Sequence, residues 1–419
     1  MSQSIRLWTS LWLAVSVSMA AAVSLGMTRF AYALLLPPMR EDLLWTYTLA
    51  GAMNTFNALG YLAGALLTPW FLRRWGAVRV LIVGSVLASV LMALTGFFTW
   101  ALYLLLQRFL AGLASAAVFV SGGLLAARLG AHLPSQSGLL LGIYYGGTGW
   151  GIVFSALCVP AAIAMAGYYQ AQPTWSWAWW CLAFVCAAIS AALYSIRSHL
   201  NLWMPELSTA VLAPPNENQA SSSTTALNAP TPLSWRVWTA GLLGYGLFGV
   251  GYIGYMTFVV AVLREQGASS ANITFFYAAL GLAVVASSRI WAGMLNHFKG
   301  GQALAILNAL LSVATLIPAL TSAWPAMLLS GVLFGAVFLS VVASTTAMVK
   351  HNLPAAQWAS GISAFTVVFA VGQIVGPTVV GWIADGPGGL QRGLVFSAAA
   401  LLLGALVAWQ QRPLQLQTS

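Results

Sequence analysis

The run WTSLWLAVSVSMAAAVSLGMTRFAYALLL, residues 8–36, decides the fold, because it carries a single charge, Arg29. About 20 mainly apolar residues suffice for one helical crossing of a bilayer. Charged residues make up 5% of the 419-residue chain, against roughly 25% in an ordinary soluble domain, which excludes a soluble globule. The run extends well past the small residues Ala20–Ala22, so it predicts an uncleaved membrane helix and not a signal peptide.

Similar apolar runs recur along the chain, separated by charges, Pro and Gly. They fall at about 47–71, 79–98, 100–127, 137–163, 175–197, 236–263, 270–295, 302–322, 325–349, 357–384 and 390–410. With the first run they predict an all-α membrane protein of twelve transmembrane helices. The tryptophans between 175 and 180 are expected to form an aromatic belt at the membrane surface.

The basic residues indicate the orientation. Twelve crossings place both termini on one side, and the loops on that side hold ten Lys and Arg against three on the other. The positive-inside rule therefore places both termini in the cytoplasm. Topology accounts for most of the net charge of +10, and no basic stripe with interleaved aromatics indicates nucleic acid.

The chain divides into two related halves. Residues 198–235 are polar and rich in Pro, Asn and Ser, which predicts a flexible cytoplasmic linker between a six-helix bundle over 1–197 and a second over 236–419. A shift of about 223 to 225 residues brings Gly26 onto Gly249 and Gly147 onto Gly372, which indicates an internal repeat. Two pseudo-symmetric bundles of this kind enclose a midplane cavity that rocking opens to either side.

Several motifs resemble those of the major facilitator superfamily over essentially the whole chain. They are Pro69-x-x-x-Arg73-Arg74-Trp75-Gly76, its second copy Gly293-x-x-x-His297-Phe298-Lys299-Gly300, Arg108-Phe109-Leu110-Ala111-Gly112, Gly372-Gln373-x-x-Gly376-Pro377 with Asp385 beyond it, and the opening Gly26-Met27-Thr28-Arg29-Phe30-Ala31-Tyr32. The opening is similar to a bacterial branch of YbfB/YjiJ-type permeases. The loop motif departs from the usual pattern, because Arg73 and His297 replace its acidic residue.

The resemblance implies a major facilitator fold, transport by alternating access and a place in the bacterial inner membrane. It also implies residues that gate or couple the movement. We expect these to be Arg108, Arg73, Arg74, Gly76, Gly300, Gly376, Pro377 and Asp385.

The titratable residues restrict the mechanism. All six acidic residues are predicted in loops or at helix ends, and all four histidines in cytoplasmic loops or at their edges. Proton-coupled exporters of cations normally place such groups within the bilayer, so the sequence disfavours an exporter of this kind. Asp385 or Asp42 could still reach a water-filled vestibule from the end of its helix. Cys158, Cys181 and Cys186 lie in apolar runs without metal-ligand spacing, and no catalytic set is present. We expect no enzyme activity, metal or cofactor.

Arg29 is the sharpest functional feature. It lies eight residues before Pro37, about 12 Å below the outer end of its helix, and an arginine side chain keeps its positive charge in proteins. An anionic substrate could supply its counter-charge, or helix carbonyls could hold it as a structural arginine. Arg108 is open to the same two interpretations, whereas Arg289, near the end of its helix, is expected to reach toward the membrane surface.

Polar and aromatic side chains on other helices complete the predicted substrate site. Asn54, Asn57 and Tyr61 share a helix face and either hydrogen-bond a neighbouring helix, the favoured alternative, or line the cavity. With Arg29, the predicted substrate-binding set is Tyr32, Asn54, Asn57, Tyr144, Tyr252, Tyr255 and Gln373.

These features predict a monomeric carrier of a small organic anion, working by exchange or facilitated uniport among membrane lipid, without a nucleic-acid partner. One alternative is a proton-linked exporter of a neutral or amphiphilic compound. An alternative from another class is a membrane sensor or scaffold that transports nothing.

Overall fold

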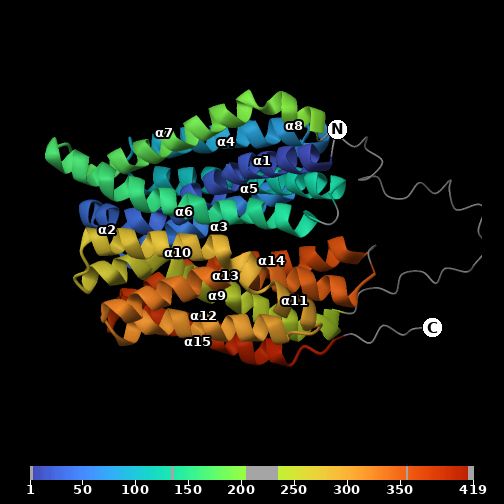
Figure 1. Cartoon of the computed structure of the whole chain (residues 1–419). Coiled ribbons are helices and arrows are strands. Elements are labelled where there is room, and N and C mark those ends of the chain that lie inside the picture. The colour runs from blue at the N-terminus through green and yellow to red at the C-terminus, as the bar shows by residue number, and fades with distance from the viewer. Residues whose placement is uncertain (1–2, 134–135, 204–234, 355–356, 414–419) are drawn as a thin grey trace, which may run out of the picture.

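The structure is a computed structural model that describes residues 3–133, 136–203, 235–354 and 357–413. The described residues fold into helices joined by short turns (Figure 1). The first crossing is built from three consecutive segments, α1 (Gln3–Ala21), a π-helical stretch η1 (Ala22–Phe30) and α2 (Tyr32–Leu43). The predicted helix over 8–36 is therefore present, with a wider turn at Arg29.

The remaining helices follow the predicted runs closely. In the first half they are α3 (Tyr47–Trp75), α4 (Ala77–Thr95), α5 (Ala101–His132), α6 (Ser137–Tyr168), α7 (Thr174–Ser195) and α8 (Arg197–Trp203). In the second half they are α9 (Trp235–Glu265), α10 (Ser270–Ile290), α11 (Ala292–His297), α12 (Gln302–Leu320), α13 (Trp324–Asn352), α14 (Trp358–Ala384) and α15 (Gly389–Trp409).

Local chemistry sets several of these boundaries. Thr46 caps α3 by accepting a hydrogen bond from the Leu49 amide at 3.1 Å, which satisfies an N–H that the first helical turn leaves unpaired. Gly76 ends α3 with a φ of 77°, a conformation that side chains with a Cβ rarely adopt. The predicted linker begins with a short helix, α8, and residues 204–234 lie outside the described part.

Within the described residues, eleven segments are long and apolar enough to span a membrane. The twelfth long helix, α3, has 29 residues and would be about 43 Å long at 1.5 Å per residue, but its Asn, Thr and Arg residues lower its hydropathy. The all-α membrane fold is thus confirmed.

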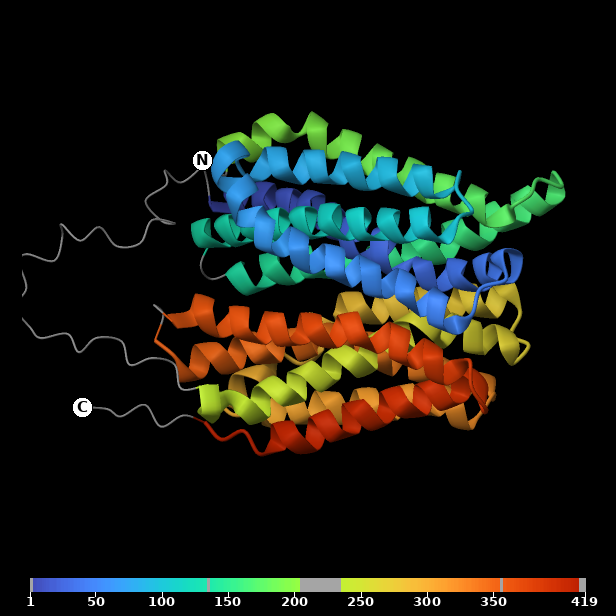
Figure 2. The same ribbon diagram turned by 180° about the vertical axis from the view of Figure 1, so that it is seen from behind.

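The two halves pack side by side along their length. In Figures 1 and 2, α1 to α8 form one bundle and α9 to α15 the other. The start of α1 and the end of α15 lie at the same end, here called the terminal end. The opposite end, which holds Leu43, Tyr168, Glu265 and Ala384, is here called the far end.

Two helix pairs join the halves through backbone contacts at glycines. In the α3–α14 pair, a methyl group on Gly51 would overlap the Pro377 carbonyl. In the α6–α10 pair, a methyl group on Gly149 would overlap the Gly281 carbonyl. Small residues of this kind let membrane helices approach closely.

The predicted aromatic belt is only partly present. Trp175 and Trp179 are each 1% exposed, so they pack inside the bundle and do not face lipid. The Trp175 indole N–H donates to Asp42 at 2.8 Å, and that of Trp179 contacts the Met39 sulfur at 3.4 Å. Both indole N–H groups contact side chains within the protein, whereas the general enrichment of tryptophan at membrane surfaces predicts that they face the membrane interface.

Candidate functional site

Arg29 lies on η1 at the plane where the two halves meet. It is 3% exposed, and its Nη2 donates to the side-chain oxygen of Gln373 on α14, in the opposite half. Its guanidinium carbon lies 5.6 Å from the centre of the Tyr61 ring, and its Nε has no hydrogen-bond partner among the described residues. The described carboxylates all lie at helix ends, so the partner of this buried cation is a neutral amide.

Arg108 is equally buried but more fully bound. Its two terminal nitrogens donate to the Thr28 carbonyl at 2.8 Å and to the Asn54 side-chain oxygen at 3.0 Å. Its guanidinium carbon also lies 4.9 Å from the centre of the Tyr32 ring. This arrangement matches the structural interpretation of Arg108, in which carbonyls and amides hold the charge.

The asparagine face of α3 serves helix packing, the alternative that the sequence favoured. The Asn54 amide donates to the Thr257 hydroxyl on α9 at 2.8 Å, so Asn54 joins Arg108 to the opposite half. The Asn57 amide donates to the Arg108 carbonyl at 3.1 Å. Both side chains are therefore part of one polar layer with Arg29, Gln373 and Arg108.

The predicted tyrosines divide between this layer and other places. Tyr32 donates to the Ala50 carbonyl at 2.9 Å and the centre of its ring lies 4.9 Å from the Arg108 guanidinium carbon, so it belongs to the layer. Tyr252 stacks on Phe338 and Phe369. Tyr144 instead donates to the Phe119 carbonyl at 2.6 Å inside the first half. Tyr255 bonds Ser330 at 2.7 Å inside the second half. The structure therefore does not bring Tyr144 and Tyr255 together with Arg29.

The predicted gating residues lie at both ends of the molecule. Arg73 and Arg74 are exposed in the last turn of α3, beside Gly76 at the terminal end. Gly300 packs against the Gln411 carbonyl. In the middle of α14, Gly376 faces the backbone of Val250, and the neighbouring Pro377 lies within the helix.

Asp385 joins the halves at the far end. Its carboxylate accepts from the amides of Tyr47 and Thr48 at 2.7 and 2.8 Å and from the Thr48 hydroxyl at 2.6 Å. A carboxylate at the C-terminus of α14 therefore binds the N-terminus of α3 in the other half, where the helix dipole favours negative charge. Nearby, Tyr47 donates its hydroxyl to Glu265.

The halves part at the terminal end. A cavity of about 1100 Å³ lies there between α1 and α6 of one half and α10, α11 and α13 of the other. Arg29 and Gln373 do not line it. The molecule is thus closed at the far end and hollow at the terminal end, a state expected of a carrier that alternates between two openings.

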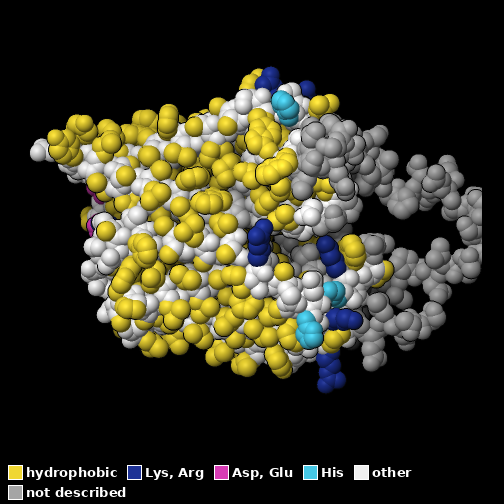
Figure 3. Space-filling view, in the orientation of Figure 1, with side chains coloured by type: hydrophobic (Ala, Val, Ile, Leu, Met, Phe, Trp, Pro, Cys, Tyr) yellow, Lys and Arg dark blue, Asp and Glu magenta, His cyan; other side chains and the backbone are white. Residues whose placement is uncertain are grey.

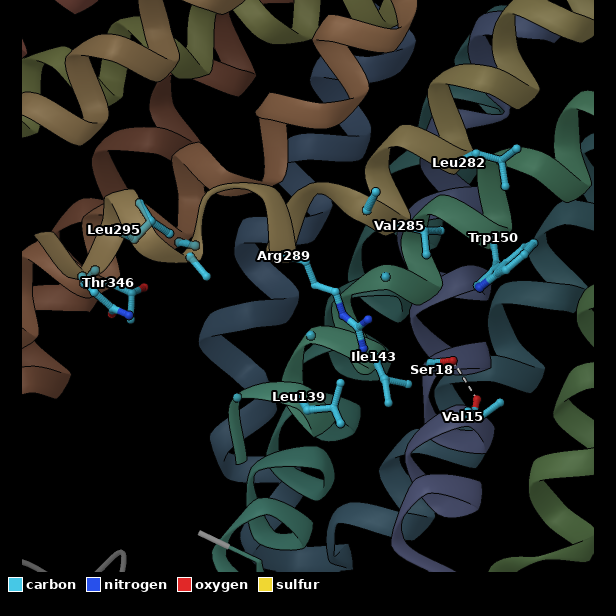
Figure 4. A pocket seen from close by; sticks show the side chains of 18 of the residues that line it. Val15, Ser18, Leu139, Ile143, Trp150, Leu282, Val285, Arg289, Leu295 and Thr346 are labelled. Atoms are coloured by element: carbon cyan, nitrogen blue, oxygen red, sulfur yellow. Dashed lines mark hydrogen bonds between the residues drawn. The ribbon is translucent and has the colours of Figure 1, made fainter. Parts of the chain in front are cut away.

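The cavity includes residues that the sequence interpretation missed. Arg289, Lys350 and His351 line it, and its described lining holds no acidic residue. Arg289 extends from α10 toward Ile143 on α6 (Figure 4) and lines the cavity between the halves, while its reach toward the membrane surface stays a prediction. A signal was present in Gly138, Gly142 and Gly146, whose spacing of four leaves one face of α6 bare.

The described residues offer no group of three or more His, Cys, Asp or Glu that could hold a metal ion. The three cysteines are free thiols. Cys186 is buried against the sulfurs of Met27 and Met92, each at 3.8 Å, and packs as a small apolar side chain.

Solved structures of transporters share this fold. The nucleoside transporter NupG aligns with a TM-score of 0.64 at 14% identity, over 96% of this chain and 99% of that one. A bacterial homologue of the human lysosomal transporter Spinster, inward-facing and unoccupied, aligns with a TM-score of 0.62 at 16% identity, over 98% and 99%. The human organic anion transporter MFSD10 (TETRAN) aligns with a TM-score of 0.58 at 14% identity, over 97% and 100%.

At these identities the structural matches establish the fold alone. No curated protein matches the sequence. A sequence family described as "Uncharacterised MFS-type transporter YbfB" matches residues 21–409, which is nearly the whole chain and includes every helix of the polar layer. The chain therefore belongs to the YbfB-type family of major facilitator superfamily transporters.

Proposed function

We propose that the cargo is a small organic anion of the carboxylate or phosphate type, and that Arg29 binds its charge. The observation that carries this proposal is a buried guanidinium at the meeting plane of the halves whose described hydrogen-bond partner is the neutral Gln373. Arginine carries a permanent positive charge in proteins, and its planar guanidinium suits bidentate pairing with a carboxylate or phosphate.

The energetics favour an anion over a neutral compound at this position. A buried charge is stabilised by an opposite charge much more strongly than by an amide, because the surrounding dielectric is low. The unpartnered Nε of Arg29 offers a further donor to a ligand with two acceptor oxygens. An anion that displaces Gln373 would supply the counter-charge that none of the described residues places there.

The position of the bond also suits alternating access. Arg29 belongs to the first half and Gln373 to the second, so relative movement of the halves must stretch or break their hydrogen bond. A ligand that replaces Gln373 as the hydrogen-bond partner of Arg29 would break this link between the halves, so that its binding would favour their relative movement. The basic lining of the terminal-end cavity would raise the local concentration of anions on the route to Arg29.

The chain's place in the membrane belongs to the same proposal. We place it in the bacterial inner membrane as a monomer with both termini cytoplasmic, so that the cavity opens to the cytoplasm. The ten basic residues predicted in loops on that side support this orientation. Labelling of an introduced cysteine at Ser419 from inside or outside the cell tests it.

A thermal-shift screen of small carboxylates and phosphates on purified protein tests the cargo. A ligand that binds only the folded protein raises its melting temperature by mass action. Arg29→Ala should abolish the shift, and Arg29→Lys should reduce it, because a single ammonium cannot pair bidentately. Arg79→Gln, which removes an exposed charge at the start of α4, is the matched control. Unchanged anion affinity in both Arg29 variants would refute the proposal.

Flux into liposomes distinguishes the modes of transport. Counterflow of the anion without proton movement supports exchange. Acidification that accompanies flux of a neutral compound would instead identify the proton-linked exporter. The absence of any flux, in protein that binds ligand, would favour a sensor.

A further inference from the structure

We propose that the terminal-end cavity is a second binding site, built for an amphiphilic organic anion. The acidic head would bind Arg289, Lys350 and His351, and an apolar body would lie against α6. The site lies apart from the polar layer around Arg29. At 1.5 Å per residue, Met19, which lines the cavity on α1, is about 15 Å along the first crossing from Arg29.

The size of the cavity suits a ligand of this kind. Its volume of about 1100 Å³ lies at the upper limit of the range of roughly 300 to 1000 Å³ that is common for small-molecule pockets. In Figure 3, basic and histidine side chains gather at the end of the molecule where the surface is hollowed between the halves. Arg289 and Lys350 are exposed, so a ligand can reach these charges from outside.

The charges of the cavity all have one sign and come from one half. Arg289 extends from α10 across the space between the halves (Figure 4). The Lys350 ammonium lies 5.5 Å from the centre of the Trp358 ring, an attraction that leaves its positive charge uncompensated. The Nδ1 of His351 is buried and has no hydrogen-bond partner among the described residues. Such a group is an available donor or acceptor for a ligand.

The opposite wall is apolar and partly bare. Gly138, Gly142 and Gly146 share one face of α6, and a methyl group on Gly138 would meet nothing within 4 Å. Ile143 and Trp150 line the same wall. A wall of this kind offers hydrophobic contact and room, but no partner for charge, so it fits a hydrocarbon or aromatic body.

A basic cluster opposite an apolar wall favours one class of ligand over two others. A small hydrophilic anion would leave the apolar wall exposed to water, and a neutral amphiphile would leave the three basic groups without an acidic partner. A carboxylate or phosphate on an apolar body uses both. Such a molecule could enter from water as a free acid or from the bilayer as an anionic lipid, and the two sources share the same chemistry. The inference does not require that Arg29 bind cargo.

Trp150 provides a direct reading of occupancy, because its ring lies in the cavity. The probe is 11-bromoundecanoate, whose bromine quenches tryptophan fluorescence on contact. The protein contains 19 tryptophans, so the signal is the saturable quenching that Trp150→Phe removes. The neutral alcohol 11-bromoundecanol has the same chain and tests the need for charge. Phosphatidylglycerol with brominated chains, added to phosphatidylcholine nanodiscs, tests supply from the bilayer.

Removal of the cations should weaken binding of the acid. Loss of a hydrogen bond to a charged group reduces affinity roughly 10- to 100-fold, and we expect this change for Arg289→Gln combined with Lys350→Gln. Arg79→Gln and Arg29→Ala should leave the Trp150 signal unchanged. The single variant Arg289→Gln, at an exposed position, gives the same reading if the double variant is unstable.

The outcomes are distinct. Saturable quenching of Trp150 by the acid supports a site filled from water, and quenching by the brominated phosphatidylglycerol supports one filled from the bilayer. Equal quenching by acid and alcohol, or quenching that the Arg289 and Lys350 variants do not weaken, would overturn the proposal. A loss of the signal in Arg29→Ala alone would show that this cavity and the Arg29 site are one.

Discussion

Replacement of Asp385 by Asn should loosen closure of the far end. In the structure this carboxylate accepts three hydrogen bonds from the first turn of α3, in the opposite half. Asparagine has the same shape, but it keeps only one acceptor oxygen and no charge. Its amide N–H₂ would face the backbone N–H of Tyr47 or Thr48, and two donors cannot bond each other.

The magnitude follows from those contacts. A hydrogen bond to a charged group contributes about 1.5 to 3 kcal/mol, and a charge at a helix N-terminus roughly 0.3 to 1 kcal/mol. The Asp385 side chain is exposed, so solvent screening reduces both values. We therefore expect Asp385→Asn to destabilise the closed far end by about 1 to 2 kcal/mol, which shifts the ratio of closed to open molecules roughly 5- to 30-fold.

The dependence on pH has a definite sign. Partial burial raises the pKa of the Asp385 carboxyl, but the hydrogen bonds from Thr48 and Tyr47 and the Arg40 charge outweigh it, and the pKa lies below its ordinary value. A depressed pKa means that this contribution to closure is present above the ordinary value of about 3.9 and is lost as the pH falls through the lower one. Between pH 5 and 8 closure should therefore not depend on Asp385 protonation.

Spin labels at Tyr168→Cys and Leu320→Cys measure closure, because both side chains are well exposed at the far end of opposite halves. The three native cysteines are first replaced by alanine. Asp42→Asn is the matched control, since Asp42 accepts its hydrogen bond from Trp175 within one half. An unchanged distance distribution in Asp385→Asn, or the same broadening in Asp42→Asn, would refute the reasoning.

Three further predictions concern contacts between helices. Gly51→Ala should separate α3 from α14, because the added methyl group would overlap the Pro377 carbonyl, and the same spin labels should report a more open far end. Arg108→Leu should remove the donor to the Thr28 carbonyl and to the Asn54 side-chain oxygen and lower the free energy of unfolding by about 1 to 3 kcal/mol for each oxygen left unsatisfied, measured by denaturant titration in detergent; wild-type stability would contradict it. Tyr277→Phe removes the donor to the Phe30 carbonyl at 2.6 Å and should cost about 1 to 3 kcal/mol, seen as a lower melting temperature, with exposed Tyr168→Phe as the control.

The helices were predictable because they depend on properties that run along the chain. Apolar runs interrupted by charge, Pro and Gly place α6 and α14 within a few residues of their observed bounds. The π-helical turn at η1 was not predictable, because a wider turn leaves no distinct pattern in the residue order.

The candidate site was only partly predictable, because residue counts give positions along a helix and the shared faces of helices, but not which helices meet. Counting gave the shared face of Asn54 and Asn57. The membrane depth of Arg29 stays a prediction, because it was counted from Pro37, whereas the helix continues through Pro37 to Leu43. The bond from Arg29 to Gln373 joins residues 344 positions apart, and only the packing of the halves brings them together. Arg289 shows the same limit, since its distance from a helix end did not reveal that it faces a cavity.

The glycine contacts between α3 and α14 and between α6 and α10 have a mechanical consequence. At these points backbone meets backbone, so each glycine provides a place where one helix can turn on the other without a rotamer change. Side chains still link the helices elsewhere, as in the 2.8 Å hydrogen bond between the Thr55 and Thr378 hydroxyls of α3 and α14. The contacts at Gly51 and Gly149 can therefore act as pivots, while the resistance to rocking comes from separate polar contacts, such as that of the Asp385 carboxylate with the start of α3.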